Sequence, residues 1–132
     1  MEPSIFTRII NGEIPCHKIY EDEKVIVFLD IHPIGPGHTL VVSKQQTDHM
    51  WDLGDNNYQA MFAVAKMLAP KIRQVFGKQR TVLIVEGYDT PHAHLHLIPA
   101  DSHKEASGEQ DMESEPDHAA LAVIATKIKE SL

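Results

Sequence analysis

The chain has 132 residues, nine histidines and a net charge of −7 with histidine neutral. This acidic balance argues against a broad binding surface for nucleic acid or anionic membrane, and the length predicts a single domain over residues 1–132. No apolar stretch approaches the roughly 18 residues of a membrane span, and the first residues lack the pattern of a signal peptide. A lone Cys16 forms no internal disulfide. We therefore expect a cytoplasmic protein.

The first third of the chain predicts a short helix followed by three strands. Apolar residues at helical spacing over 5–10 end at Asn11-Gly12. Residues 17–20 and 24–30 are β-branched or aromatic around a tight connection, which predicts a hairpin, and the uniformly apolar 25–29 predicts a strand buried on both faces. Beyond a loop rich in proline and glycine, residues 39–43 predict the third strand.

The rest of the chain predicts one long helix, two more strands and a terminal helix. Apolar spacing places the long helix at about 56–76, with Asp55 capping its start, and Pro70 is expected to kink or divide it. Strands at 81–85 and 92–99 should pair. An acidic segment, 101–117, is expected to be a mobile surface loop before a terminal helix at 118–131.

These elements predict an α+β fold. We expect an antiparallel sheet of about five strands, with the long helix packed on one face and the C-terminal helix beside it.

Three histidines alternate along the last predicted strand. Alternate side chains of a strand share a face, so His92, His94 and His96 should project together while Ala93 and Leu95 face the core. Such a row can bind a metal, divide a nucleophile and a proton donor between neighbours, or lie on a solvated face. Strict repetition of histidine on an otherwise apolar strand favours a functional site.

The sequence around this row resembles a known family. The segment HAHLHLIP matches the His-x-His-x-His signature, followed by two apolar residues and proline, of the histidine triad family of nucleotide hydrolases and transferases. The segments SIFTRIINGEIP and YEDEKVIVFLDIHPIGPGHTLVVSK are similar to the family's N-terminal half, so the resemblance covers about residues 4–100. It implies a HIT-like fold for the predicted α+β sheet.

The resemblance implies a covalent mechanism. In the family the middle histidine, here His94, attacks the α-phosphate and forms a nucleotidyl-histidine that water hydrolyses. Attack needs one free ring nitrogen, so an acceptor such as a backbone carbonyl should hold the other N–H. The family assigns His96 and His92 to proton delivery to the leaving group and to binding of phosphate oxygens, and His38 would join them from a neighbouring strand.

The resemblance also implies a nucleotide pocket. Asp30 matches the carboxylate that accepts both ribose hydroxyls, although an aspartate at the end of a strand can instead cap the following turn. Thr90 offers a hydroxyl near the phosphate. The apolar residues that match those sandwiching the base, each of which is also a candidate for the core, are Ile5, Phe6, Ile9, Phe28, Ile31 and Leu40.

The chain departs from the family pattern at several places. Ser4, Thr7 and Gln46 stand where many bacterial relatives carry zinc ligands, so we expect no structural zinc and no required cofactor. Val85 replaces a common asparagine ahead of a shortened loop at 87–91, so the phosphate contacts that the family makes there do not carry over to this chain. Ala100-Asp101 replaces an arginine, which disfavours long polyphosphate substrates.

Three functions are compared on these grounds. The leading hypothesis is hydrolysis of a purine nucleoside phosphoramidate, of the AMP or GMP type, or of a related nucleotide conjugate. The alternatives are a metal-binding protein that uses the clustered histidines, disfavoured by the lack of a matched carboxylate in the motif, and a nucleotide sensor without catalysis. The family resemblance also leads us to expect a homodimer.

Overall fold

Five strands form one antiparallel sheet in the computed structural model, which describes residues 1–132. Their order across the sheet is β1-β2-β3-β5-β4, so the hairpin and the pairing of the last two strands are confirmed. The strands are β1 (Lys18–Glu21), β2 (Val25–Leu29), β3 (Thr39–Ser43), β4 (Arg80–Ile84) and β5 (His94–Ala100). Together with the helices they give the predicted α+β fold.

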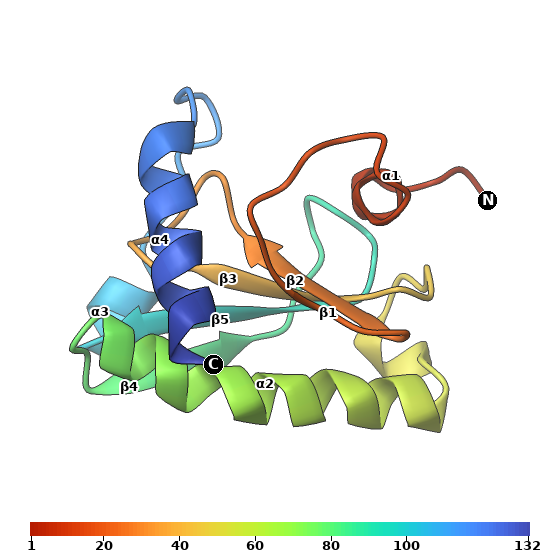
Figure 1. Cartoon of the computed structure of the whole chain (residues 1–132). Helices are drawn as coiled ribbons and strands as arrows, with labels where there is room; N and C mark the ends of the chain where they lie inside the picture. The colour runs from red at the N-terminus through yellow and green to blue at the C-terminus, as the bar shows by residue number, and fades with distance from the viewer.

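Helices cover both faces of the sheet (Figure 1). The long helix α2 (Asp55–Val75) lies under one face, and the short helix α1 (Ile5–Ile10) lies over the other. The terminal helix α4 (His118–Ser131), predicted correctly, packs against α2 and β1. A 3-10 turn, η1 (Met50–Asp52), precedes α2. No helix combines the length and apolar character needed to cross a membrane.

The main core fills the space between the sheet and α2. Strand β2 is buried along its whole length, as predicted, because it is an interior strand with packing on both faces. Every second residue of the interior strands points toward α2. Residues of this core include Val25, Val27, Leu29, Val41, Leu95 and Leu97 from the strands and Met61, Ala65, Leu68 and Ile72 from α2.

Three local predictions need correction. Gly54, not Asp55, is the N-cap of α2, and Asp55 is its first residue. Pro70 does not divide this helix, which continues to Val75, because a proline removes only its own N–H from the hydrogen-bond ladder. Strand β5 begins at His94 rather than at position 92, because the Ala93 N–H donates to the Thr47 carbonyl, beyond the end of β3.

The acidic segment 101–117 is more than a surface loop. It contains the helical turn α3 (His103–Ala106), whose N-cap Ser102 accepts a hydrogen bond from the Glu105 N–H. Lys78 holds this turn through Glu105, at 3.0 Å. Further along, the Gln110 side chain donates to Asp30 and to the His32 carbonyl, each at 2.8 Å. The segment therefore docks against the end of β2.

Candidate active site

Strand register places two of the three alternating histidines beside a second, smaller apolar cluster. His94 pairs with Val42 and His96 pairs with Leu40 across β3 and β5, on the face opposite α2. The predicted inward direction of Ala93, Leu95 and Leu97 is confirmed by their place in the main core. The second cluster, which α1 covers, contains Phe6, Ile26, Phe28, Leu40 and Val42.

His94 has the geometry of a nucleophile. Its Nδ1 lies 2.5 Å from the carbonyl oxygen of His92. A carbonyl only accepts hydrogen bonds, so Nδ1 carries the proton and Nε2 keeps its lone pair. Burial lowers the pKa of His94, which keeps the imidazole neutral near pH 7. The predicted carbonyl partner for this N–H is thus confirmed.

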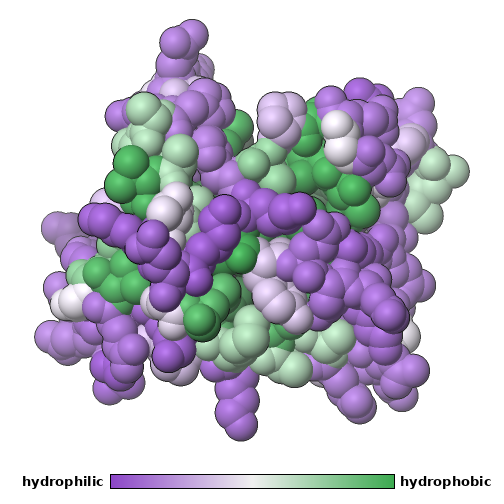
Figure 2. All heavy atoms as spheres, viewed as in Figure 1, coloured by the Kyte–Doolittle hydropathy of each residue, from purple (hydrophilic) through white to green (hydrophobic).

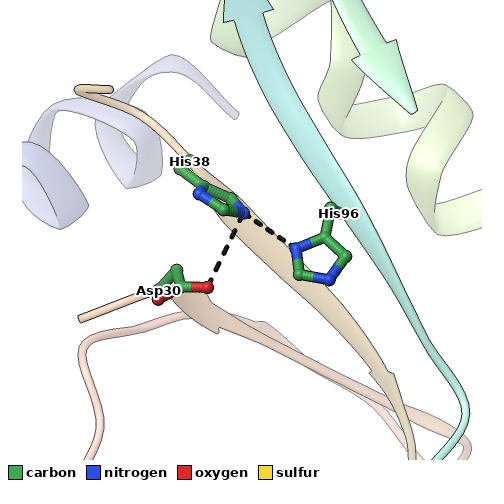
Figure 3. Close-up of side chains that lie close together, drawn as sticks. All are labelled: Asp30, His38 and His96. Atoms are coloured by element: carbon green, nitrogen blue, oxygen red, sulfur yellow. Dashed lines mark hydrogen bonds and ion pairs between the residues drawn. The ribbon is translucent and has the colours of Figure 1, made fainter. Parts of the chain in front are cut away.

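His38 and His96 form a pair whose protons are fixed by the main chain (Figure 3). The Ile34 N–H donates to His38 Nδ1 at 3.0 Å. The proton of neutral His38 is therefore on Nε2, from which it donates to His96 Nδ1 at 2.9 Å. His96 in turn carries its own proton on Nε2. A backbone amide in the loop before β3 thus sets both tautomers.

The outer nitrogen of His96 is a free donor. Figure 3 shows this nitrogen turned away from His38. His96 Nε2 is buried without a hydrogen-bond partner, and the nearest acid is Glu86, whose Oε1 lies 3.8 Å away. Burial lowers the pKa values of His38 and His96 to about 4, so both rings are neutral at pH 7. A buried N–H without a partner at a cavity wall is suited to an incoming ligand.

His92 lies apart from this group. Its Nε2 contacts the Ser43 carbonyl at 2.7 Å, and its Nδ1 contacts the Ser4 hydroxyl at 2.6 Å. The carbonyl takes the Nε2 proton, so the Ser4 hydroxyl donates to Nδ1. With both nitrogens occupied, His92 offers no free donor to a phosphate, and its contribution to the site is the carbonyl that orients His94.

Asp30 directly follows β2 and fills the capping role considered from sequence, while its role toward a ribose stays a prediction. Its Oδ1 accepts from the His32 N–H at 2.8 Å, which caps the turn. Its Oδ2 accepts from Gln110 at 2.8 Å and lies 3.6 Å from His38 Nε2. Burial raises the pKa of Asp30. Gln110 was not found from sequence because it lies in a polar segment without periodicity.

A cavity of about 240 Å³ joins these groups. The residues that line it include the catalytic candidates His94 and His96, together with all of the predicted nucleotide-binding residues. In Figure 2 the surface is hollowed between α1 and the segment that precedes α4, with apolar atoms over α1. The Phe6 ring lies edge-on to His94, with centroids 4.9 Å apart. The predicted lining residues are Ile5, Phe6, Ile9, Phe28, Asp30, Ile31, Leu40 and Thr90.

A metal fits the site poorly. Asp30, His38 and His96 each place one ligand atom within 4.8 Å of the others. The His38 Nε2 needed for such a cluster already carries a proton, because the Ile34 amide occupies Nδ1. A metal ion would have to displace that proton and break the contact between the two rings.

The positions of the family's zinc ligands hold a hydrogen-bond network instead. The Ser4 N–H and the Thr7 hydroxyl donate to Gln46 Oε1 at 2.9 and 2.6 Å, and the Ser4 hydroxyl is bound to His92. Structural zinc is bound by thiolates and imidazoles, whereas these groups are hydroxyls and an amide. The residues do not fit a structural zinc, and its absence stays a prediction that metal analysis can test.

Comparison with known proteins identifies the family. The family model described as "HIT domain" matches residues 11–103. The chain belongs to the histidine triad, or HIT, family. HIT proteins are nucleotide-binding proteins and generally hydrolases or transferases, so the resemblance stated from sequence is confirmed.

Individual HIT proteins support the same assignment. The "Protein hit" of Bacillus subtilis is 35% identical over 74% of this chain and 71% of its own length. A zinc-bound histidine triad family protein from Mycobacterium smegmatis superposes with a TM-score of 0.79 at 26% identity, over 96% of this chain and 91% of that one. The "Adenylylsulfatase HINT3" of Arabidopsis thaliana is 30% identical over 72% of this chain and 51% of its own length.

Proposed function

We propose that this HIT protein hydrolyses purine nucleoside phosphoramidates or related nucleotide conjugates at the α-phosphate, through a nucleotidyl-histidine. One observation carries the proposal. The His92 carbonyl leaves His94 Nε2 free to attack, while His96 presents an unpartnered N–H at the wall of the same cavity. A nucleophile beside a separate N–H group, which can donate a hydrogen bond to the leaving atom, is an arrangement suited to covalent transfer.

The proposed reaction has two balanced steps. First, with the bridging nitrogen of the phosphoramidate protonated, His94 Nε2 forms a bond to the α-phosphorus and the phosphorus–nitrogen bond breaks, so that the amine leaves neutral and accepts a hydrogen bond from the His96 Nε2–H. Water then attacks the phosphorus and loses a proton to the departing amine, the bond to His94 Nε2 breaks, and the nucleoside monophosphate leaves with a neutral His94. The neighbouring His38 holds the His96 ring in place through the 2.9 Å contact.

The rest of the cavity supports a nucleoside. Its apolar side, with Phe6 and Phe28, suits a flat base, and Asp30 at its polar edge suits a ribose diol. The name of the Arabidopsis relative, an adenylylsulfatase, is consistent with a nucleotide conjugate as substrate. We further propose a purine base and a homodimer, which competition between AMP and GMP and the mass in solution will test.

The test is turnover of a fluorogenic adenosine phosphoramidate. We expect wild-type protein to release the fluorophore, and His94→Ala to lose activity by about a thousandfold or more. The exposed His103, replaced by Ala, is the matched control and should retain full activity. If wild type and His94→Ala bind AMP but are equally inert, the protein is a nucleotide sensor and the catalytic proposal is wrong. Full turnover after removal of metals would exclude a catalytic metal.

A further inference from the structure

A second cavity of about 270 Å³ adjoins the nucleotide pocket at His96. The two cavities share His96, Glu86 and Gln110, whereas His94 lines only the first. The second cavity is otherwise walled by Ile34, Ile84, Ile98 and the segment 106–108. The family model matches this chain only as far as residue 103, so the segment 106–108 of this wall lies outside that match.

Reaction geometry connects this cavity to the leaving group. Displacement at phosphorus proceeds in line, so the leaving group departs on the side opposite the nucleophile. With the nucleoside in the first cavity and His94 attacking from there, the free N–H of His96 lies where it can donate a hydrogen bond to the leaving atom. That donor stands at the junction of the two cavities. We propose that the second cavity binds the leaving group during the displacement, and we call it the leaving-group seat. We propose further that Glu86 makes this seat selective for a cationic amine.

The charges around the seat carry this selectivity. Its only ionised side chain is Glu86, and no lysine or arginine lines it. The Glu86 carboxylate lies 3.8 Å from His96 Nε2, close to where the bond to the leaving atom would break. Ile34, Ile84 and Ile98 supply most of the apolar part of the wall, which suits an alkyl stem. A protonated amine on such a stem is attracted by Glu86, and a carboxylate or phosphate there is repelled.

This inference rests on the proposed function, and the test separates the two. Three adenosine 5′-phosphoramidates differ only at the far end of a four-carbon amine: 1,4-diaminobutane is cationic there, butylamine is neutral, and 4-aminobutyrate is anionic. The affinities of all three are measured calorimetrically on His94→Asn, which cannot form the covalent bond. Turnover of the same compounds is measured on the wild-type protein.

We expect the cationic compound to bind most tightly and the anionic one most weakly, with about a tenfold span because Glu86 is partly exposed. Adding Glu86→Gln should collapse this span without changing the affinity for the neutral compound. Glu23→Gln, in the exposed turn between β1 and β2, changes the net charge equally and should preserve the span.

Each outcome decides one of the proposals. Equal affinities for the three compounds, or a span that survives Glu86→Gln, would overturn the selective seat even if wild-type turnover is fast. Ordered affinities that depend on Glu86, without turnover by the wild-type protein, would support the seat and overturn the hydrolase.

Discussion

Acidification from pH 7 to pH 5 should destabilise this protein through His38 and His96. Each ring has a pKa of about 4 in the folded state, against 6.5 for an ordinary imidazole. Between these values the unfolded chain binds protons that the folded chain excludes. The free energy of unfolding therefore falls as the pH decreases through this window, and recovers above pH 6.5.

Linkage gives the size of the effect. An imidazole that binds a proton in the unfolded state but not in the folded state lowers the free energy of unfolding by about 2 kcal/mol between pH 7 and pH 5, so the pair lowers it by about 4 kcal/mol. Burial also lowers the pKa values of His92 and His94, which adds to the loss. Asp30 acts in the opposite sense, because its raised pKa gives stability at low pH that is lost as the pH rises. A loss of this size is a large part of the 5–15 kcal/mol typical of a domain.

The assay is urea unfolding at pH 7 and pH 5, followed by circular dichroism. We expect His38→Gln, whose amide oxygen can still accept from the Ile34 N–H, to reduce the wild-type loss by about 2 kcal/mol. The exposed His103→Gln should show the full loss. Equal stability at the two pH values, or a full loss in His38→Gln, would refute the inference that these two rings exclude protons in the folded state.

Three further predictions concern the walls of the site. Phe6→Ala should cost about 3 kcal/mol in urea unfolding and weaken AMP binding, because the ring packs on Phe28 and His94; exposed Tyr88→Ala should do neither. Gln110→Ala should tighten AMP binding about fivefold, because it frees Asp30 Oδ2 to accept from a ribose hydroxyl. The binding of 2′,3′-dideoxy-AMP, which lacks both hydroxyls, should not change. An equal gain for both nucleotides would contradict this prediction. Ser4→Ala should lower the free energy of unfolding by about 1–2 kcal/mol, because the Ser4 hydroxyl both caps α1 and binds His92. Ser102→Ala, which removes only a cap, should cost less. A chelator should leave the melting temperature of the wild-type protein unchanged, and unfolding by the chelator would reveal a bound metal.

Most of the fold was predictable because its signals are local. Alternation in β5 and the apolar spacing of α1 and α2 each report a buried face. The start of β5 was missed because a hydrogen bond from Ala93 to Thr47 depends on tertiary structure. Within the site, His94 and His96 stand in the alternating strand β5, and Asp30 and His38 directly flank the apolar strands β2 and β3.

The unpredicted parts of the site come from segments without periodicity. Gln110 and Glu86 lie between regular elements, so neither alternation nor helical spacing marks them. The tautomers of His38 and His96 depend on one amide of the loop that folds back on them, and composition does not specify such a contact. Sequence patterns thus located the side chains proposed to react, but not the groups that fix their protons or line the cavity around them.

The Ile34 amide has an implication for how such a site can evolve. Every residue type except proline supplies the same N–H, so position 34 is free to change its side chain while the proton arrangement of the two histidines is inherited unchanged. Because the Ile34 side chain also lines the second cavity, the position can alter which molecules fit without disturbing the chemistry beside it. An alanine scan would register only the contribution of the side chain, whereas replacing the amide by an ester would isolate the contribution of the N–H.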